Sequence, residues 1–363
     1  MRAMIFGTYD TTMHPRIATI AEGLAARGYE VTECNFPLGL STADRVDMLA
    51  KPWKAVGLVT RLVSRWTSLA LKAKRLGRPD VVVVGYLGHF DVRLARLLFR
   101  RGKIPIVLDH LVGASDTAKD RRLDGGPRQI LLRMIDSGAL RAADVIVVDT
   151  QEHLDALPPE HRDRAVVVAV GAPAAWNEAA ATAAPADGDG PLKVVFYGLY
   201  TPLQGAPVIG AALGKLAGAP VEVTMIGGGQ DEAETRAAAA GNTSVRWLDW
   251  VPSTELPGVV AEHDVCLGIF GTGQKALRVV PNKVFQGAAA GCAIVTSDTA
   301  PQHRMLGDAA VLVPPGDAGA LADALANLAQ DRAALAARRR AARELADRRF
   351  TPAQVVAPLI ERL

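Results

Sequence analysis

"DVCLGIFGTGQKALRVVPNKVFQGAAAGCAIVTSD", residues 264–298, contains the pattern that is most informative about the fold. An apolar run ends in a Gly-Thr-Gly turn at 271–273, a helical pattern begins at Pro281 and stops at Gly291, and a second apolar run follows. Proline suits the first position of a helix and glycine its carboxyl-terminal cap. The stretch therefore predicts a strand, a helix and a parallel strand, with the glycine turn at the strand's carboxyl end, where ligands bind in such folds.

The same alternation of short Val- and Ile-rich runs with helical patterns extends in both directions. In the first half the runs occupy 2–7, 29–35, 80–86, 104–110, 144–150 and 165–171. In the second half they occupy 192–198, 221–229, 244–250, 264–271, 292–298 and 309–315. Such runs are typical of strands buried on both faces of a parallel sheet. We therefore expect an α/β chain of two Rossmann-like, doubly wound domains facing each other across a cleft, which is the expected ligand site.

The domain boundary is predicted from composition. Residues 177–191, "NEAAATAAPADGDGP", offer little to pack and are interpreted as a linker. The linker separates an N-terminal domain, 1–176, from a second domain, 192–346. Residues 347–363 contain a break near Thr351 and a short final helix.

Composition restricts the class of protein. The chain has 363 residues, 49% of them hydrophobic and 22% charged, which is enough for two cores. No apolar run is long enough for a membrane span and the start of the chain is too weakly apolar for a signal peptide, so we expect a cytoplasmic protein. Cys34, Cys266 and Cys292 fit no metal-binding spacing and are expected to be buried thiols. A net charge of +3 and the lack of a known motif argue against nucleic acid as a partner.

The opening stretch also predicts an anion site. The amides at the start of the helix, together with Lys275 and Lys283, favour a phosphate or diphosphate. Asn282 and Gln286 lie four residues apart on one helix face, where their amides would bond hydroxyls beside that anion. The alternative is that the lysines form a solvated face and that the glycines and proline only punctuate the chain.

A basic segment at 51–78 has two interpretations. It holds eight Lys or Arg residues and no Asp or Glu, interleaved with apolar residues at helical spacing. Such a helix either covers the sheet with a wet basic rim, which we favour, or lies on an anionic membrane surface where a lipid-linked acceptor would be found.

Residues 192–330 resemble the donor-binding domain of retaining GT-B glycosyltransferases of the GT4 type, the glycosyl transferases group 1. The resemblance is carried in order by "VVFYGLYTPLQGAPVIGAAL", "VTMIGGGQ", "VRWLDWVPSTELPGVVAEHDVCLGIFG", "VPNKVFQGAAAGCAIVTSDTAPQHRML" and "AAVLVPPGDAGALADAL". "HPRIATIAEGLAARGYEV" and "AADVIVVDTQEHLDAL" of the first half are more loosely similar. The glycine-rich "IGGGQ" fails the GxGxxG spacing of dinucleotide sites, which argues against hydride chemistry.

The chain departs from the family pattern at the residues expected to hold the donor. Arg278 and Gln286 stand where the family usually has two glutamates, and Leu199 and Gln204 stand where it has a basic pair that holds the diphosphate. We expect Lys275, Arg278 and Lys283 to supply the missing positive charge.

The resemblance implies transfer of a sugar from a nucleotide diphosphate sugar to a hydroxyl of a small-molecule, glycan or lipid-linked acceptor, with retained anomeric configuration. Lys275, Arg278 and the helix amides would stabilise the leaving diphosphate. Neither a metal nor a further cofactor is expected. The resemblance also implies that the departing phosphate takes the acceptor proton, so no dedicated protein base is required. The resemblance also implies that 347–363 crosses back onto the N-terminal domain.

The expected site residues form three groups. The donor-binding group is Gly198, Gly227, Gly228, Gly271, Thr272, Lys275, Arg278, Asn282, Lys283 and Gln286. The catalytic group is His110, Asp109 and Lys275, with His110 facing the donor sugar unless it is a structural hydrogen bonder. Thr8, Asp10 and His14 are expected near the acceptor or the diphosphate.

Two other functions stay open at this point. A GT-B nucleotide-sugar isomerase, or epimerase, would use Asp10, Asp109 and Asp116 as acid and base. A noncatalytic GT-B subunit would bind a nucleotide without turning it over, which the replaced basic pair and glutamates favour.

Overall fold

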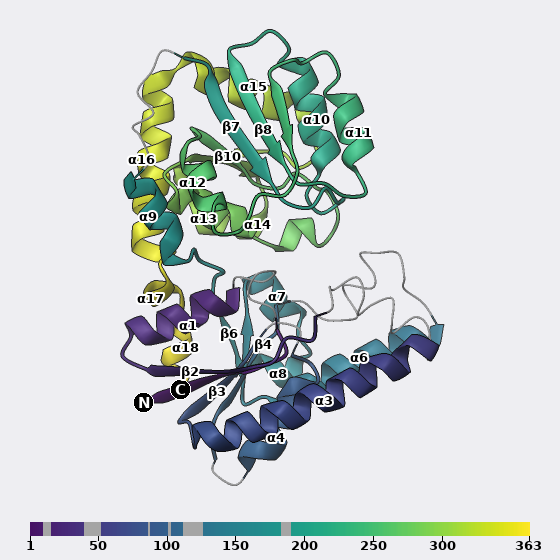
Figure 1. The fold of residues 1–363 in the computed structure, drawn as a ribbon. Coiled ribbons are helices and arrows are strands. Elements are labelled where there is room, and N and C mark those ends of the chain that lie inside the picture. The colour runs from purple at the N-terminus through teal and green to yellow at the C-terminus, as the bar shows by residue number, and fades with distance from the viewer. Residues whose placement is uncertain (10–15, 40–51, 86–87, 101–102, 112–125, 183–189) are drawn as a thin grey trace. The chain divides into compact units, whose positions relative to one another are not determined.

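The protein consists of two compact units. The computed structural model describes residues 1–9, 16–39, 52–85, 88–100, 103–111, 126–182 and 190–363. The N-terminal unit contains Met1–Ala169 and Val355–Leu363, and the C-terminal unit contains Val170–Gln354. Each is built on one six-stranded sheet of parallel strands with helices against it (Figure 1). The expected pair of doubly wound α/β domains is confirmed.

The sheet of the N-terminal unit has the order β2-β1-β3-β4-β5-β6. Its strands are β1 (Arg2–Gly7), β2 (Glu30–Asn35), β3 (Val81–Val84), β4 (Ile106–Asp109), β5 (Val145–Val148) and β6 (Ala165–Val167). Its helices include α1 (Arg16–Ala26), α3 (Pro52–Leu76), α4 (Asp91–Phe99), α6 (Gly126–Ala142), α7 (Gln151–Ala156), α8 (Pro159–Arg162) and α18 (Ala357–Ile360). The order reverses between β1 and β3, which makes the carboxyl ends of these two strands the expected ligand position in this unit.

The sheet of the C-terminal unit has the Rossmann order, β12-β11-β10-β7-β8-β9. Its strands are β7 (Leu192–Tyr197), β8 (Val221–Ile226), β9 (Val245–Leu248), β10 (Val265–Leu267), β11 (Ala293–Ser297) and β12 (Ala310–Val313). Its helices include α9 (Ala174–Thr182), α10 (Ala206–Lys215), α11 (Glu232–Ala238), α12 (Leu256–Ala261), α13 (Asn282–Ala289), α14 (Ala300–Leu306), α15 (Ala318–Gln330) and α16 (Arg332–Arg349), with the short 3-10 turns η2 (Ala276–Arg278) and η3 (Gly307–Ala309). The order reverses between β7 and β10.

Strand β3 shows why the Val-rich runs form buried strands. All four of its valines are at most 1% exposed. Val82 and Val84 pack into one hydrophobic core, whereas Val81 and Val83 pack into a second. Because alternate side chains point to opposite faces of a strand, each face of the sheet has a core of its own. The three cysteines are free and buried, as expected.

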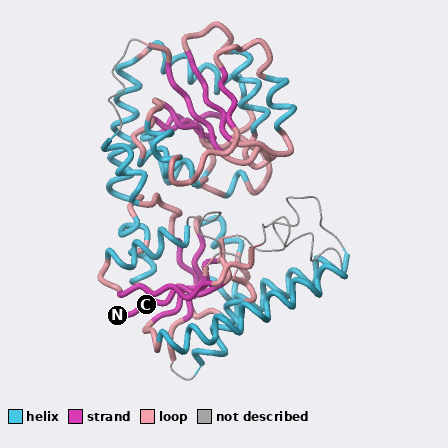
Figure 2. The backbone as a smooth tube through the Cα atoms, viewed as in Figure 1, coloured by secondary structure: helices cyan, strands magenta, loops and turns pink. Residues whose placement is uncertain are grey.

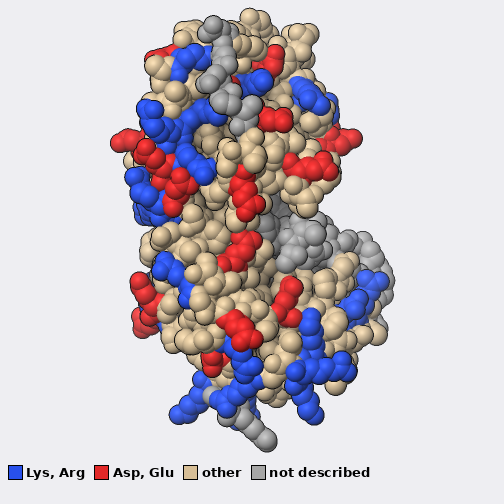
Figure 3. Space-filling view, turned by 60° about the vertical axis from the view of Figure 1, so that its left-hand side comes forward, with Lys and Arg blue, Asp and Glu red and all other residues tan. Residues whose placement is uncertain are grey.

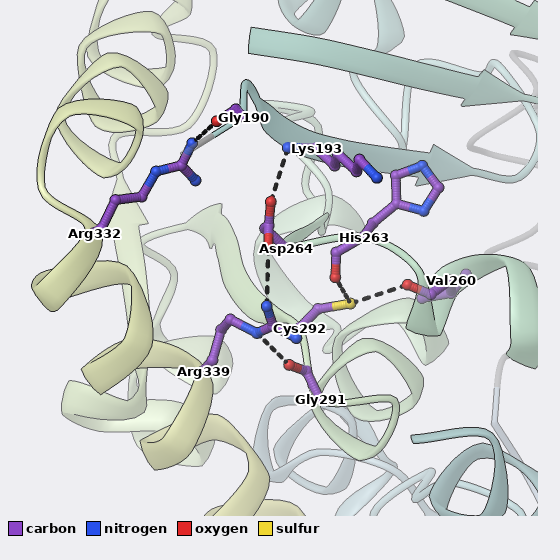
Figure 4. Close-up of polar contacts among 9 residues, drawn as sticks. All are labelled: Gly190, Lys193, Val260, His263, Asp264, Gly291, Cys292, Arg332 and Arg339. Atoms are coloured by element: carbon purple, nitrogen blue, oxygen red, sulfur yellow. Dashed lines mark hydrogen bonds and ion pairs between the residues drawn. The ribbon is translucent and has the colours of Figure 1, made fainter. Parts of the chain in front are cut away.

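Arginines of α16 attach this helix to one edge of the C-terminal unit (Figure 4). Arg339 donates from Nη1 to Oδ1 of Asp264 at 2.9 Å and from Nε to the carbonyl of Gly291 at 2.9 Å. Asp264 also accepts a bond from the backbone amide of Lys193 at 3.0 Å. Arg332 donates to the carbonyl of Gly190. Figure 3 shows basic and acidic side chains next to one another on the surface of this unit. Within α16, Nε of Arg343 lies 3.1 Å from Oδ1 of Asp347.

The structure corrects the sequence analysis at three places. Residues 174–182, where the predicted linker begins, form α9 (Figure 2), and Trp176 stacks on Tyr197 of β7 at 5.9 Å between ring centroids. Pro281 precedes α13 as its N-cap instead of being its first residue. The C-terminal unit ends at 354, at the end of the short helix α17 (Pro352–Val355), instead of at 346, and the chain continues from Val355 in the N-terminal unit, which contains α18.

Candidate functional site

The candidate site lies at the carboxyl edge of the C-terminal sheet, where the strand order reverses between β7 and β10. Gly198 follows β7 with a φ of 137°, and Gly227 follows the adjacent strand β8 with a φ of 109°. A Cβ atom on Gly227 would lie 2.3 Å from the carbonyl oxygen of Gly198. Only glycine fits this approach, so two of the predicted donor-binding glycines are in direct backbone contact.

The loop after β10 joins the same edge. A Cβ on Gly271 would lie 2.3 Å from the carbonyl oxygen of Pro202, and Phe270 donates its amide to the carbonyl of Gln204 at 2.9 Å. Gly228 faces the end of the Glu232 side chain. The strand ends at 198, 227 and 271 are thus brought together by backbone packing, as the glycine pattern of the sequence predicts.

Lys283 is the buried cation of this edge. Its side chain comes from the first turn of α13 and is only 5% exposed. Nζ donates to Oε1 of Gln204 at 2.5 Å and lies 3.8 Å from the ring centroid of Phe196. It would lie 3.4 Å from a Cβ on Gly198. Burial lowers the pKa of Lys283 to about 7.

Gln286 lies one turn further along α13 and is also buried. Its Oε1 accepts a hydrogen bond from the hydroxyl of Tyr197 at 2.9 Å, so one of its two lone pairs is already used within the protein. Burial raises the pKa of Tyr197, which keeps this phenol protonated. The side-chain amides of Asn282 and Gln286 were predicted to act together. They differ in environment, because Asn282 is exposed and Gln286 is buried.

The other predicted donor-binding residues lie between β10 and α13. Thr272 is exposed, and its methyl group faces Gly316 in the loop after β12. Lys275 is half-buried before η2, and Arg278 is exposed at its end. Lys283 differs from these two cations by being buried against β7.

In the N-terminal unit, the hydroxyl of Thr8 is hydrogen-bonded within the protein. Asp91, the first residue of α4, accepts from both the amide and the hydroxyl of Thr8 at 2.8 Å. Its other oxygen accepts from Nε1 of Trp66 on α3 at 2.9 Å. Thr8 therefore orders the end of β1 against two helices. Asp10 and His14, which the sequence analysis placed beside Thr8, are outside the described residues.

Asp109 and His110 end strand β4 with different surroundings. The Asp109 carboxylate is bonded to Nε of Arg16 at 2.8 Å and is fully buried, so it anchors α1 to the sheet. His110 is 9% exposed, and its Nδ1 has no hydrogen-bond partner among the described residues. Burial, with the nearby His89, lowers the pKa of His110 to about 3, so its imidazole is neutral near pH 7. Such a ring is suited to donate or accept a hydrogen bond, not to supply a proton.

Sequence reasoning missed several residues that shape these two edges. His89 lies 5.6 Å from His110 between ring centroids, and its Nε2 lies 3.2 Å from the Asp136 carboxylate of α6. The polar residues His89 and Asp91, which follow shortly after the run that forms β3, were the available signal.

Among the residues described by the structure, no group of three His, Cys, Asp or Glu side chains is placed to hold a metal ion. No helix in this part of the chain is long and apolar enough to cross a membrane.

Comparison with solved structures defines the class of fold as GT-B. The chain is similar to sucrose-phosphate synthase from Thermosynechococcus elongatus, with a TM-score of 0.71, 14% identity and coverage of 99% of this chain and 97% of that one. It is similar to Anabaena HepE in complex with UDP-glucose, with a TM-score of 0.64, 14% identity and full coverage of both chains at 100%. It is also similar to the UDP-forming α,α-trehalose-phosphate synthase from Burkholderia vietnamiensis, with a TM-score of 0.67, 15% identity and coverage of 99% and 96%.

A protein-family model also matches most of the C-terminal unit. Residues 191–331 match the model of the family described as "Glycosyl transferases group 1". This match and the glycosyltransferases among the similar structures bear out the expected enzyme class, a glycosyltransferase. The matched segment contains the whole candidate site, from Gly198 to Gln286. No protein among those with curated descriptions matches the sequence.

Proposed function

We propose that the protein is a retaining glycosyltransferase that moves a sugar from a nucleotide diphosphate sugar to a hydroxyl acceptor. The observation that carries the proposal is the environment of Lys283. It is buried at the carboxyl edge of a nucleotide-binding type of sheet, and no carboxylate among the described residues is bonded to it. A buried ammonium without a counterion is costly, and a bound diphosphate would supply the missing negative charge.

The proposed donor site combines this lysine with the rest of the edge. The glycines at 198 and 227 allow the backbone to approach a nucleotide. Lys275 and Arg278, on the segment before α13, would join Lys283 in stabilising the leaving diphosphate, as would the amides at the start of α13. HepE, which has the same fold, is described with UDP-glucose. UDP-sugars are therefore the first donors to test.

The proposed reaction does not require a side chain that acts as a base. As the sugar becomes oxocarbenium-like, the diphosphate gains negative charge, and fixed cations that face it lower the barrier. The leaving phosphate oxygen then takes the proton of the attacking acceptor hydroxyl. The neutral imidazole of His110 would orient a sugar hydroxyl through its unpartnered Nδ1. We propose no requirement for a metal, so activity should survive EDTA.

Nucleotide binding is the first test. A thermal-shift panel of UDP, GDP, ADP, TDP and CDP compares the wild type with Lys283→Met, Lys275→Ala and Lys215→Met, the last being an exposed lysine at the end of α10. A ligand at a hundred times its Kd adds about 2.7 kcal/mol of stability. We expect one diphosphate to stabilise the wild type and Lys215→Met, and to stabilise Lys283→Met and Lys275→Ala much less. A folded wild type that no diphosphate stabilises would contradict the proposal.

Product analysis then tests the reaction. Retention predicts that the new glycosidic bond has the anomeric configuration of the donor, which NMR of the product reads directly. Conversion of the donor without any acceptor would indicate the isomerase instead, and binding without turnover would indicate the noncatalytic subunit.

We favour a sheet-covering role for the basic helix α3, and as the alternative we propose that its basic face also contacts an anionic membrane surface. Leu69 and Ala73 of α3 are buried in the unit, while Arg61, Arg65 and Lys74 are exposed on it. One face of α3 thus covers the unit and leaves the basic face outside. Cosedimentation with phosphatidylserine vesicles, lost in Arg61→Glu/Arg65→Glu, would support this contact, and equal binding to neutral vesicles would contradict it. A cytoplasmic location stays a prediction.

A further inference from the structure

Lys283 is held in a nearly apolar enclosure with one neutral hydrogen-bond partner. Nζ contacts the face of the Phe196 ring at 3.8 Å from its centroid and the Tyr197 ring at 5.9 Å. Nζ donates a hydrogen bond to the side-chain oxygen of Gln204, an uncharged acceptor. An uncharged amine can still make this bond, because it too carries N–H groups, although an ammonium donates a stronger one.

The groups around Lys283 carry no negative charge near pH 7. Tyr197 of β7 and Cys266 of β10 are titratable groups that interact with it, and burial raises both of their pKa values, that of Cys266 to about 12. The strands and helices that pack against α13 add no buried acidic side chain: β11 and α12 have no ionisable side chain, and Glu178 of α9 and Glu344 and Asp347 of α16 are exposed. Arg343 of α16 contacts α13 at its opposite end, where it donates to the carbonyl of Ala289.

This environment moves the titration of the amine into the physiological range. Burial lowers the pKa of Lys283 from its ordinary value of 10.5 to about 7. The amine therefore loses its proton as the pH rises through about 7 in the empty site. A negative ligand beside it has the opposite effect, because an opposite charge favours the ammonium.

We propose that a diphosphate enters this site by taking the Lys283 amine from Gln204, and that one proton from solution is bound together with it. The inference rests on the proposed donor site and deepens it. The neutral Gln204 holds the amine above Gly198 in the empty protein, and the nitrogen becomes an ammonium bonded to a phosphate oxygen in the complex. Gln204 is thus a positioning residue that competes with the ligand.

Because binding of the diphosphate takes up a proton, the affinity must fall as the pH rises. At pH 8.5 the free amine is mostly neutral, so binding takes up close to one proton, and the affinity falls about tenfold for each pH unit above 7 until the pKa of the complex is reached. The terminal phosphate of a nucleoside diphosphate has a pKa near 6 and is fully ionised at this pH, so it contributes little to the proton count.

Calorimetry in two buffers of different ionisation enthalpy measures this proton directly. The probe is UDP, or the member of the five-diphosphate panel that stabilises the protein, titrated at pH 8.5. We expect uptake of close to one proton for the wild type and for Lys215→Met, and uptake near zero for Lys283→Arg, whose guanidinium is always charged. Binding without proton uptake in the wild type, or uptake that persists in Lys283→Arg, would overturn the inference and leave the proposed function intact. If no diphosphate binds at all, both fail.

The variant Gln204→Met tests whether Gln204 competes with the ligand for the Lys283 amine or only holds the loop in place. The methionine keeps the length of the side chain but cannot compete for the amine as the amide oxygen does. If Gln204 competes with the ligand, this variant binds the diphosphate at least as tightly as the wild type, while Lys283→Met loses tenfold or more in affinity. If the Gln204–Lys283 bond only pins the loop, both variants lose affinity to the same extent, and the inference is wrong.

Discussion

Arg16 donates from Nε to Oδ1 of Asp109 at 2.8 Å, and the two side chains are only 3% and 0% exposed. The pair joins the first residue of α1 to the last residue of β4, and Arg16 also donates to the carbonyl of Val168 at 2.9 Å. A carboxylate enclosed in this way holds the N-terminal unit together. It is not open to a substrate in this conformation, although the sequence analysis grouped Asp109 with the catalytic residues.

Asp109→Ala should therefore destabilise the protein. Removal of one partner leaves the buried Arg16 charge uncompensated, which costs about 3–5 kcal/mol. Urea unfolding measures the change. Asp347→Ala is the control, because this carboxylate is exposed and pairs with Arg343 at the surface, where such pairs contribute about 1 kcal/mol or less. An Asp109→Ala protein of unchanged stability that has lost all activity would contradict the structural role and support a catalytic one.

Gly227→Ala should damage the candidate site. Alanine at a φ of 109° is strained by about 1–3 kcal/mol, and its Cβ would meet the Gly198 carbonyl oxygen at 2.3 Å. We expect a lower thermal midpoint and weaker binding of the stabilising diphosphate. Gly258→Ala makes the same substitution in α12, where nothing lies within 4 Å, and should leave stability equal or raise it by up to about 1 kcal/mol. Equal effects of the two substitutions would contradict this prediction.

Arg339→Ala tests the attachment of α16. The substitution removes two hydrogen bonds and leaves Asp264, which is 6% exposed, without its cation. We expect a loss of about 2–4 kcal/mol in urea unfolding. Arg340→Ala removes the next arginine of the same helix, which is exposed, and should change stability by less than about 0.5 kcal/mol. A comparable loss in both variants would mean that helix propensity, not the Asp264 contact, decides the effect.

His110→Gln should reduce the acid sensitivity of the protein. Because burial lowers the pKa of His110 to about 3 in the folded state, the unfolded chain binds more protons between that value and about 6.5, and stability falls as the pH falls through this window. Between pH 7.5 and 5.5 His110 should account for a loss of about 1 kcal/mol, which His110→Gln removes. His303→Gln, at an exposed histidine, is the control. A stability profile that His110→Gln leaves unchanged would contradict the prediction.

The sequence alone gave a reliable account of the local structure. All twelve predicted strands are present, because runs such as 81–84 are Val-rich enough to be buried on both faces of a sheet. Gly291 ends α13 with a φ of 84°, as the glycine in the sequence predicted. Residues 177–182 were assigned wrongly, because an Ala-rich segment without its packing partner reads equally well as linker or helix. Trp176, which stacks on Tyr197, provides that partner in the structure.

The order of strands and the partners of the polar side chains were decided by tertiary structure. Lys283 is 79 residues from Gln204, and Asp109 is 93 residues from Arg16. The periodicity of a helix or a strand does not relate positions so far apart in sequence, because their contact depends on the order of the strands in the sheet and on how the helices pack. The sequence determined which residues form strands, turns and a cationic segment, since those choices depend on near neighbours. Only the folded chain decided that Lys283 is the buried cation at the carboxyl edge of the C-terminal sheet and that Asp109 is paired with Arg16, because burial and pairing depend on distant residues.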